Sequence, residues 1–180
     1  RNDGRRAFNA RVCHHPAFSS VQIHKDYVDC VRWLGDLCAT KSVDDRILLW
    51  RPRGTAAAQG GEAAATEATF ELLQEFPLPN SHLWFVRFSL NPSASVLACG
   101  NKAGHVYVWD PHHAPATHIQ KLHAKKCTRV VRQTAVSYDG ATILGCTEDG
   151  AIWRWDRVAG GAVSEDPEDE PQSEEQEEAG

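Results

Sequence analysis

The chain has 180 residues, of which 42% are hydrophobic and 24% are charged, as is ordinary for a soluble globular protein. No apolar run approaches the roughly 20 residues that a membrane helix needs, and the polar, basic first residues are not expected to form a secretory leader. The net charge of −5 hides a division, because nine of the 17 residues from 164 to 180 are Asp or Glu and the remainder of the chain is net positive.

The chain contains no Met and begins at Arg1, so we expect it to be a piece of a longer protein. Its six cysteines show no CxxC pair, and most of them fall in apolar runs of strand-like pattern. In such runs Cys acts as a small buried hydrophobe. This usage favours a reducing compartment, the cytosol or the nucleus.

In chain order, residues 1–22 are predicted to be an irregular lead-in or the end of a preceding unit, and residues 23–158 to form short strands with an insertion at 53–68. Ten of the fifteen residues 54–68 are Ala or Gly, which favours a flexible loop over a helix. Residues 159–180 lack aromatic side chains and are expected to form a disordered acidic tail. The expected strands are Val28–Leu34, Leu37–Ser42, Arg46–Trp50, Thr69–Phe76, Trp84–Leu90, Val96–Gly100, His105–Trp109, Thr117–Leu122, Val131–Ser137, Thr142–Cys146 and Ala151–Trp155.

An internal repeat organises these strands. The stretches KSVDDRILLW, GNKAGHVYVW and CTEDGAIWRW end at Trp50, Trp109 and Trp155, at intervals of 59 and 46 residues. Five residues before each Trp stands the second residue of an expected tight turn: Asp45, Gly104 and Gly150. Repeats of this length that close on Trp-Asp are typical of WD-type β-propeller blades.

The repeat predicts an all-β fold, a partial WD40-type β-propeller of about three blades. Because closed propellers have roughly four to eight blades, we expect this piece to be unstable on its own. The three repeated Trp residues are interpreted as structural, since each blade packs alike. Trp33 and Trp153 also fall on strands and are expected to pack.

Four segments resemble one family in the same order along the chain. They are YVDCVRWLGD (27–36), LWFVRFS (83–89), RQTAVSYDGATIL (132–144) and EDGAIWRWDR (148–157). Together, over about residues 13–157, they resemble the C-terminal part of the EED/ESC family, the WD-repeat subunit of Polycomb repressive complex 2, and most closely its plant members, the fertilization-independent endosperm proteins. The family fold is a seven-bladed propeller, of which this chain would supply about the last three blades.

The resemblance implies a nuclear, non-catalytic subunit. Family members act as a scaffold for the SET-domain methyltransferase of lysine 27 of histone H3, together with the other subunits of the complex. They also bind trimethyl-lysine on the H3 tail and support transcriptional repression. The resemblance implies no cofactor, no membrane and no direct sequence-specific binding of nucleic acid.

The physics of trimethyl-lysine binding directs attention to Trp84 and Phe85. A quaternary ammonium donates no hydrogen bond, so aromatic faces can surround it, and each cation–π contact contributes about 0.5–2 kcal/mol. Trp84 and Phe85 are consecutive at the expected start of an inner strand, and the equivalent positions of the other blades are Asp29-Cys30 and Arg132-Gln133. By resemblance, Trp84 and Phe85 form a partial cage, with Phe replacing a Tyr of animal members, and the other cage aromatics belong to preceding blades. Arg132 stands where an Arg contacts the peptide backbone.

Other interpretations of these residues remain open. Adjacent Trp and Phe in a β-protein are commonly core residues, and Arg132 could simply form a salt bridge on the rim. A WD40 adaptor of another class, such as a ubiquitin-ligase substrate receptor, is the alternative function. That class usually has an Arg two residues after Trp-Asp, and neither Trp-Asp pair here fits. A truncated product without reader function is a third possibility.

Metal binding and catalysis find little support. The residues His112, His113, His118, His123 and Cys127 are scattered over an expected loop and strand rather than paired as zinc ligands are, and Cys13-His14-His15 lacks a partner pair. The chain has no GxSxG elbow, no phosphate-binding GxxxxGK[ST] or GxGxxG, and no basic stripe with interleaved aromatics. We therefore expect no metal site and no enzyme activity.

Overall fold

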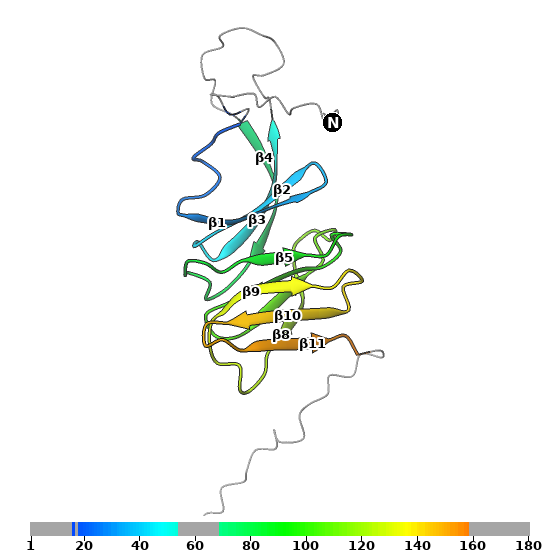
Figure 1. Cartoon of the computed structure of the whole chain (residues 1–180). Helices are drawn as coiled ribbons and strands as arrows, with labels where there is room; N and C mark the ends of the chain where they lie inside the picture. Colours follow the sequence, from blue (N-terminus) through cyan, green and yellow to red (C-terminus); the bar gives the residue numbers. More distant parts are fainter. Residues whose placement is uncertain (1–15, 17, 54–68, 159–180) are drawn as a thin grey trace, which may run out of the picture.

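The computed structural model describes Pro16, residues 18–53 and residues 69–158, and its regular elements there are all β-strands (Figure 1). The Ala/Gly-rich residues 54–68, the tail 159–180 and the Cys13-His14-His15 run lie outside the described residues. The strands are β1 (Val28–Leu34), β2 (Leu37–Ser42), β3 (Arg46–Arg53), β4 (Thr69–Pro77), β5 (Phe88–Leu90), β6 (Leu97–Gly100), β7 (Val106–Trp109), β8 (His118–Leu122), β9 (Val131–Val136), β10 (Thr142–Thr147) and β11 (Ile152–Asp156). Within these ranges there is no helix of the length and apolarity that crossing a membrane would require.

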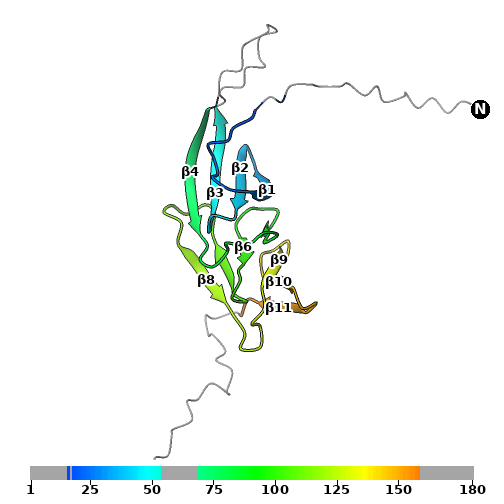
Figure 2. The same ribbon diagram turned by 90° about the vertical axis from the view of Figure 1, so that its left-hand side faces the viewer.

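The strands form three antiparallel sheets that lie one above the next (Figures 1 and 2). The orders are β1-β2-β3-β4, β5-β6-β7-β8 and β11-β10-β9, so each sheet is a meander of consecutive strands. Arg87, which directly precedes β5, and Gln133, in β9, form a parallel bridge between the second and third sheets. This is the expected arrangement of a partial WD40-type propeller, with β1, β5 and β9 as the inner strands.

The repeated turns take the backbone conformation that their sequence predicts. Asp45, Gly104 and Gly150 have φ angles of 56°, 82° and 86°, in the left-handed region that Gly adopts freely and Asp tolerates. Each turn joins the second and third strands of its sheet, which pair antiparallel. The expected tight turns are therefore confirmed at all three positions.

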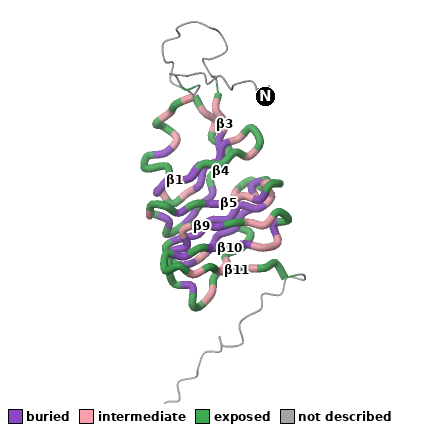
Figure 3. The backbone as a smooth tube through the Cα atoms, viewed as in Figure 1, coloured by how far each residue is buried: buried purple, intermediate pink, exposed green. Residues whose placement is uncertain are grey.

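Two apolar cores lie between successive sheets, where the buried backbone is concentrated in Figure 3. The first core joins sheets one and two and includes Ile47, Phe76 and Trp109. The second joins sheets two and three through Val106, Val131 and their neighbours. Full burial of a large aliphatic or aromatic side chain contributes about 1.5–3 kcal/mol to stability, so these two cores hold the sheets together.

The tryptophans follow the expectation with one exception. Trp50 and Trp109 are buried, and Trp153 and Trp155 pack on the second core with their ring centroids 6.5 Å apart. Trp33 was predicted to pack but is 70% exposed. It extends from the face of β1 that is turned away from the second sheet, whereas its neighbours Cys30 and Leu34 contact the first core.

A buried polar chain holds the lead-in segment on the first sheet. His24 Nε2 lies 2.7 Å from Thr40 Oγ1, which also accepts a 3.0 Å hydrogen bond from Trp50 Nε1. Burial lowers the pKa of His24, although Asp44 opposes this shift. His24 Nδ1 lies 3.6 Å from Asp44 Oδ2, beyond hydrogen-bonding distance. His24 Nδ1 is therefore buried without a hydrogen-bond partner among the described residues, and the tautomer of the ring decides whether His24 or Thr40 donates.

Candidate functional site

Three exposed aromatic side chains lie in a row where the first and second sheets meet. Tyr27 precedes β1, and its ring centroid is 4.3 Å from that of Trp84; Trp84 in turn is 6.1 Å from Phe85, with the planes inclined by 74°. Their exposed fractions are 63%, 46% and 61%. Single exposed apolar side chains are common, whereas three contiguous aromatic rings form a patch of the kind that marks interaction sites.

Trp84 and Phe85 belong to a turn, residues 82–87, which we call the aromatic turn. The sequence placed these residues at the start of an inner strand, but β5 begins only at Phe88. The reason is Phe85, whose φ of 59° is incompatible with an extended strand. A left-handed backbone at a bulky aromatic residue costs roughly 1–2 kcal/mol and persists only when its surroundings hold it.

The third sheet holds the aromatic turn through Arg132 on β9. Its Nη1 donates a 2.6 Å hydrogen bond to the carbonyl oxygen of Trp84, and its Nη2 pairs with Glu148 Oε2 at 2.9 Å. The main chain adds a 2.8 Å bond from Arg87 N to the carbonyl of Arg132. The guanidinium therefore joins the turn to the β10–β11 loop, which contains Glu148.

The first sheet holds the same turn through Asp29 on β1. Asp29 Oδ2 accepts a 3.3 Å hydrogen bond from Val86 N, and both of its oxygens lie 3.4 Å from Lys41 Nζ. Val86 itself is completely buried in the first core. The turn is consequently held by polar contacts to the first and third sheets and by the burial of its own Val86.

The loop that leads into the aromatic turn is also anchored. Asp45 accepts hydrogen bonds from Leu78 N at its carbonyl and from Ser81 N at its carboxylate, at 2.9 and 2.6 Å. Asn101, which is fully buried, donates from Nδ2 to the carbonyl of Pro79 at 3.0 Å. These side chains belong to the repeated turns of the first two sheets, so the fold itself places the loop.

The structure brings the predicted site residues together. Trp84, Phe85 and Arg132 lie on one rim of the stack, with Asp29 beside them. Cys30 differs from its equivalents, because it is buried and its Sγ faces the carbonyl of Phe88 at 3.7 Å.

Two residues of this rim, Tyr27 and Glu148, were not found from the sequence. Aligning the blades by their inner strands selects Asp29-Cys30, two residues past Tyr27. The signal for Tyr27 was an aromatic residue directly before a strand, next to Asp26, whose carboxylate accepts from Tyr27 N at 2.7 Å.

This rim is chemically suited to bind a cation. The faces of aromatic rings attract cations, and the carboxylates of Asp29 and Glu148 contact Val86 N and Arg132, which hold the row. The carboxylates are paired with Lys41 and Arg132, so the rings are the groups that can contact a ligand without losing a partner. The arrangement favours a cation without hydrogen bonds of its own to satisfy.

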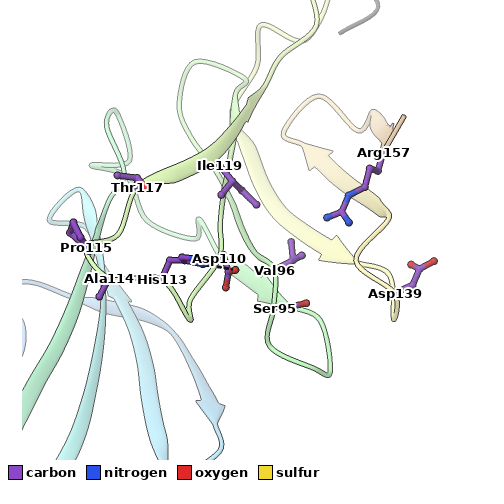
Figure 4. Close-up of a pocket in the computed structure, with 10 residues that line it drawn as sticks. All are labelled: Ser95, Val96, Asp110, His113, Ala114, Pro115, Thr117, Ile119, Asp139 and Arg157. Atoms are coloured by element: carbon purple, nitrogen blue, oxygen red, sulfur yellow. Dashed lines mark hydrogen bonds and ion pairs between the residues drawn. The ribbon is translucent and has the colours of Figure 1, made fainter. Parts of the chain in front are cut away.

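A cavity of about 540 Å³ lies at the opposite rim (Figure 4). Ser95 and Asp139, on its wall, follow the ends of β5 and β9, whereas the aromatic turn and Arg132 lie where those two strands begin. Its polar residues are largely engaged nearby, because Asp139 binds Ser137 and Ala141 N, and Asp110 binds His113. We therefore regard the cavity as an opening between two sheets.

The histidines considered as metal ligands have other contacts. His113 Nδ1 lies 2.8 Å from Asp110, His118 meets the ring of Tyr107 edge-on, and the His123 ring packs against His105. Among the described residues, no three His, Cys, Asp or Glu side chains are placed to hold a metal ion.

Comparisons with known proteins identify relatives over most of the chain. No family model matches it. It is 45% identical over 136 residues to Polycomb group protein FIE2 of Zea mays, covering 76% of this chain and 34% of that protein. It is 36% identical over 146 residues to Polycomb protein esc of Drosophila melanogaster, covering 80% and 34%.

A solved structure supports the fold. A chain of ctPRC2 in complex with H3K27me3 and H3K27M matches 80% of this chain with a TM-score of 0.64 and 16% identity, over 54% of its own length. At that identity the match concerns the fold alone. The chain spans about a third of the length of the curated relatives that it matches. Over that span it belongs to the EED/ESC family of Polycomb group proteins, as the relatives FIE2 and esc show.

Proposed function

We propose that this chain forms part of a non-catalytic WD-repeat subunit of Polycomb repressive complex 2, and that its aromatic rim binds trimethyl-lysine of the histone H3 tail. The observation that supports this most strongly is the row of Tyr27, Trp84 and Phe85, exposed and in mutual contact. A family relationship to Polycomb proteins and a fold match to a Polycomb complex containing H3K27me3 agree with it.

The selectivity of such a site follows from hydration. A trimethylated ammonium is weakly hydrated, so it exchanges water for aromatic faces at low cost, whereas an unmodified ammonium loses strong hydrogen bonds for the same contacts. Two ring contacts would contribute roughly 1–4 kcal/mol in total. Phe85 provides the same face as a Tyr at this position, so the missing hydroxyl does not weaken the proposal.

Arg132 has two roles in this proposal. Two of its five N–H donors hold Trp84 and Glu148, which fixes the guanidinium at the edge of the rim. The remaining donors are proposed to bind carbonyl oxygens of the histone peptide. An arginine that is already fixed loses little side-chain entropy when the peptide arrives.

The remaining parts of the proposal come from the family. They are scaffolding of a SET-domain methyltransferase for lysine 27 of histone H3, contact with the other subunits of the complex, action in the nucleus, and transcriptional repression. Co-purification of the complete protein with a SET-domain methyltransferase tests the scaffold role.

The reader role is tested by the affinity of the complete protein for H3-tail peptides. Fluorescence anisotropy should show tighter binding of the trimethylated peptide than of the unmodified one. Phe85→Ala should weaken the trimethylated peptide about tenfold, the loss of one good cation–π contact.

Tyr138→Ala is the matched control, because Tyr138 is an 82% exposed aromatic residue that follows the end of β9 and so lies at the opposite rim. It should leave the affinity unchanged. Equal effects of the two substitutions, or none from Phe85→Ala, would contradict the proposal.

A further inference from the structure

Lys41 on β2 is fully buried and has Asp29 and the carbonyl of Ser42 as its hydrogen-bond partners. Its side chain has no exposed surface, a rare condition for lysine unless it is paired. Nζ contacts both carboxylate oxygens of Asp29 at 3.4 Å and donates to the carbonyl of Ser42 at 3.1 Å. Asp29, in turn, is only 9% exposed.

A buried ion pair of this kind is weak support for stability. Removing both charges from water costs as much as their attraction returns, so that apolar replacements are often neutral or stabilising. The pair is therefore better understood through what it holds in place. Asp29 Oδ2 accepts the hydrogen bond of Val86 N, the residue that follows Phe85.

The two anchors of the aromatic turn hold the two peptide groups on either side of Phe85. Arg132 binds the carbonyl of the preceding peptide, that of Trp84, and Asp29 binds the N–H of the following one, that of Val86. With both peptide planes held, Phe85 is constrained to its φ of 59° and its ring to the exposed side. The first anchor comes from the third sheet and the second from the first sheet.

We propose that the buried Lys41–Asp29 pair is a positioning device: Asp29 holds Val86 N, and with it the Phe85 ring, ready for the ligand, and Lys41 balances the charge of the buried Asp29 carboxylate. The proposal rests on the function proposed above, since the ligand it serves is trimethyl-lysine. Lys41 and Asp29 are positioning residues, because they act on the ligand through the backbone of the turn.

The test separates the hydrogen bond from the charges. Lys41→Met combined with Asp29→Asn removes both charges but keeps an oxygen that can accept from Val86 N. Lys41→Met combined with Asp29→Ala removes the charges and the acceptor together. A purely structural ion pair predicts equal peptide binding by the two double variants.

The positioning proposal predicts a difference between them. In the complete protein, Lys41→Met/Asp29→Asn should bind the trimethylated H3 peptide within about threefold of the parent, and Lys41→Met/Asp29→Ala about tenfold more weakly, the loss of one well-placed hydrogen bond. Amide hydrogen exchange should show Val86 N–H protected in the former and exposed to exchange in the latter. Urea unfolding confirms that both variants are folded.

Equal affinities of the two double variants, or equal protection of the Val86 amide, would overturn the proposal. If the Ala variant does not fold, Lys41→Met/Asp29→Ser replaces it, because a serine hydroxyl is too short to reach Val86 N. If the parent protein itself does not distinguish trimethylated from unmodified peptide, the proposed function fails. The exchange of the Val86 amide still decides whether the pair positions the turn.

Discussion

Phe85 contributes little to the stability of the fold. A phenylalanine with most of its ring exposed gains little from burial, and its left-handed backbone is strained. Glycine would adopt the same backbone without strain. Strain of this kind concentrates at ligand sites, where a fixed side-chain position outweighs its cost.

Phe85→Gly should therefore separate stability from binding. We expect the free energy of unfolding to stay constant or rise by up to about 1 kcal/mol, since glycine relieves the positive φ and little apolar contact is lost. Trimethyl-lysine binding should weaken about tenfold, as with Phe85→Ala, because the same ring is removed. Urea unfolding and peptide anisotropy measure the two quantities, and a loss of stability greater than 1 kcal/mol would show that the ring is a structural residue.

At this scale most of the candidate site residues could be predicted from the sequence, but their backbone conformation could not. Adjacent aromatics at 84–85 and the arginine at 132 are visible in the letters, and they meet in the structure. The left-handed backbone at Phe85 is not visible, because no Gly or Asn marks it. Tyr27 was missed since its contact with Trp84 depends on how two sheets stack.

At the scale of elements, the repeated turns differ in how tightly they are packed, although they occupy the same position in each repeat. Gly104 and Gly150 have nearly the same φ, 82° and 86°. A Cβ on Gly104 would overlap the carbonyl of Cys127, whereas one on Gly150 would meet nothing within 4 Å. The second turn is therefore packed against the β8–β9 loop that leads to Arg132, and the third is open.

The two glycines form a matched pair of substitutions. Gly150→Ala should cost about 1–2 kcal/mol, the strain of a left-handed alanine. Gly104→Ala should cost about 2 kcal/mol more, because the carbonyl of Cys127 is backbone and cannot move aside easily. Chemical unfolding of both variants tests this, and equal losses would mean that the β8–β9 loop is not held against the turn.

Most strands could be predicted from alternation and turn residues, and the exception is instructive. The first sheet begins and ends its first two strands where the pattern placed them, at Val28–Leu34 and Leu37–Ser42. The second inner strand was predicted from Trp84 but contains only Phe88–Leu90. Apolar residues continue from the aromatic turn into β5. The hydrophobic pattern alone therefore does not distinguish a strand from a turn.

At the scale of the whole molecule, the stack of three sheets has apolar side chains on both of its outer faces. Val31 and Trp33 are exposed on the first sheet, and Leu144 and Ile152 on the last. In a propeller each sheet packs between two others, so these faces correspond to inter-blade contacts. This fits a chain that spans about a third of the length of its relatives, and it gives a reason why Trp33, expected to pack because it falls on a strand, is exposed here.

The rim also depends on the whole stack, because the aromatic turn lies in the second sheet and is anchored from the first and the third. No single sheet contains the site. A change in the packing of either neighbour should therefore alter ligand binding before it unfolds the protein.

The most direct measurement compares three H3-tail peptides that differ only at lysine 27: trimethyl-lysine, unmodified lysine, and a neutral isostere with a tert-butyl group in place of the trimethylammonium. Cation–π binding predicts that the complete protein binds trimethyl-lysine about tenfold more tightly than the isostere, which matches its shape but lacks its charge, and more tightly than lysine. Equal affinity for trimethyl-lysine and its neutral isostere would show a hydrophobic pocket, and equal affinity for all three would show that the aromatic rim does not read methylation.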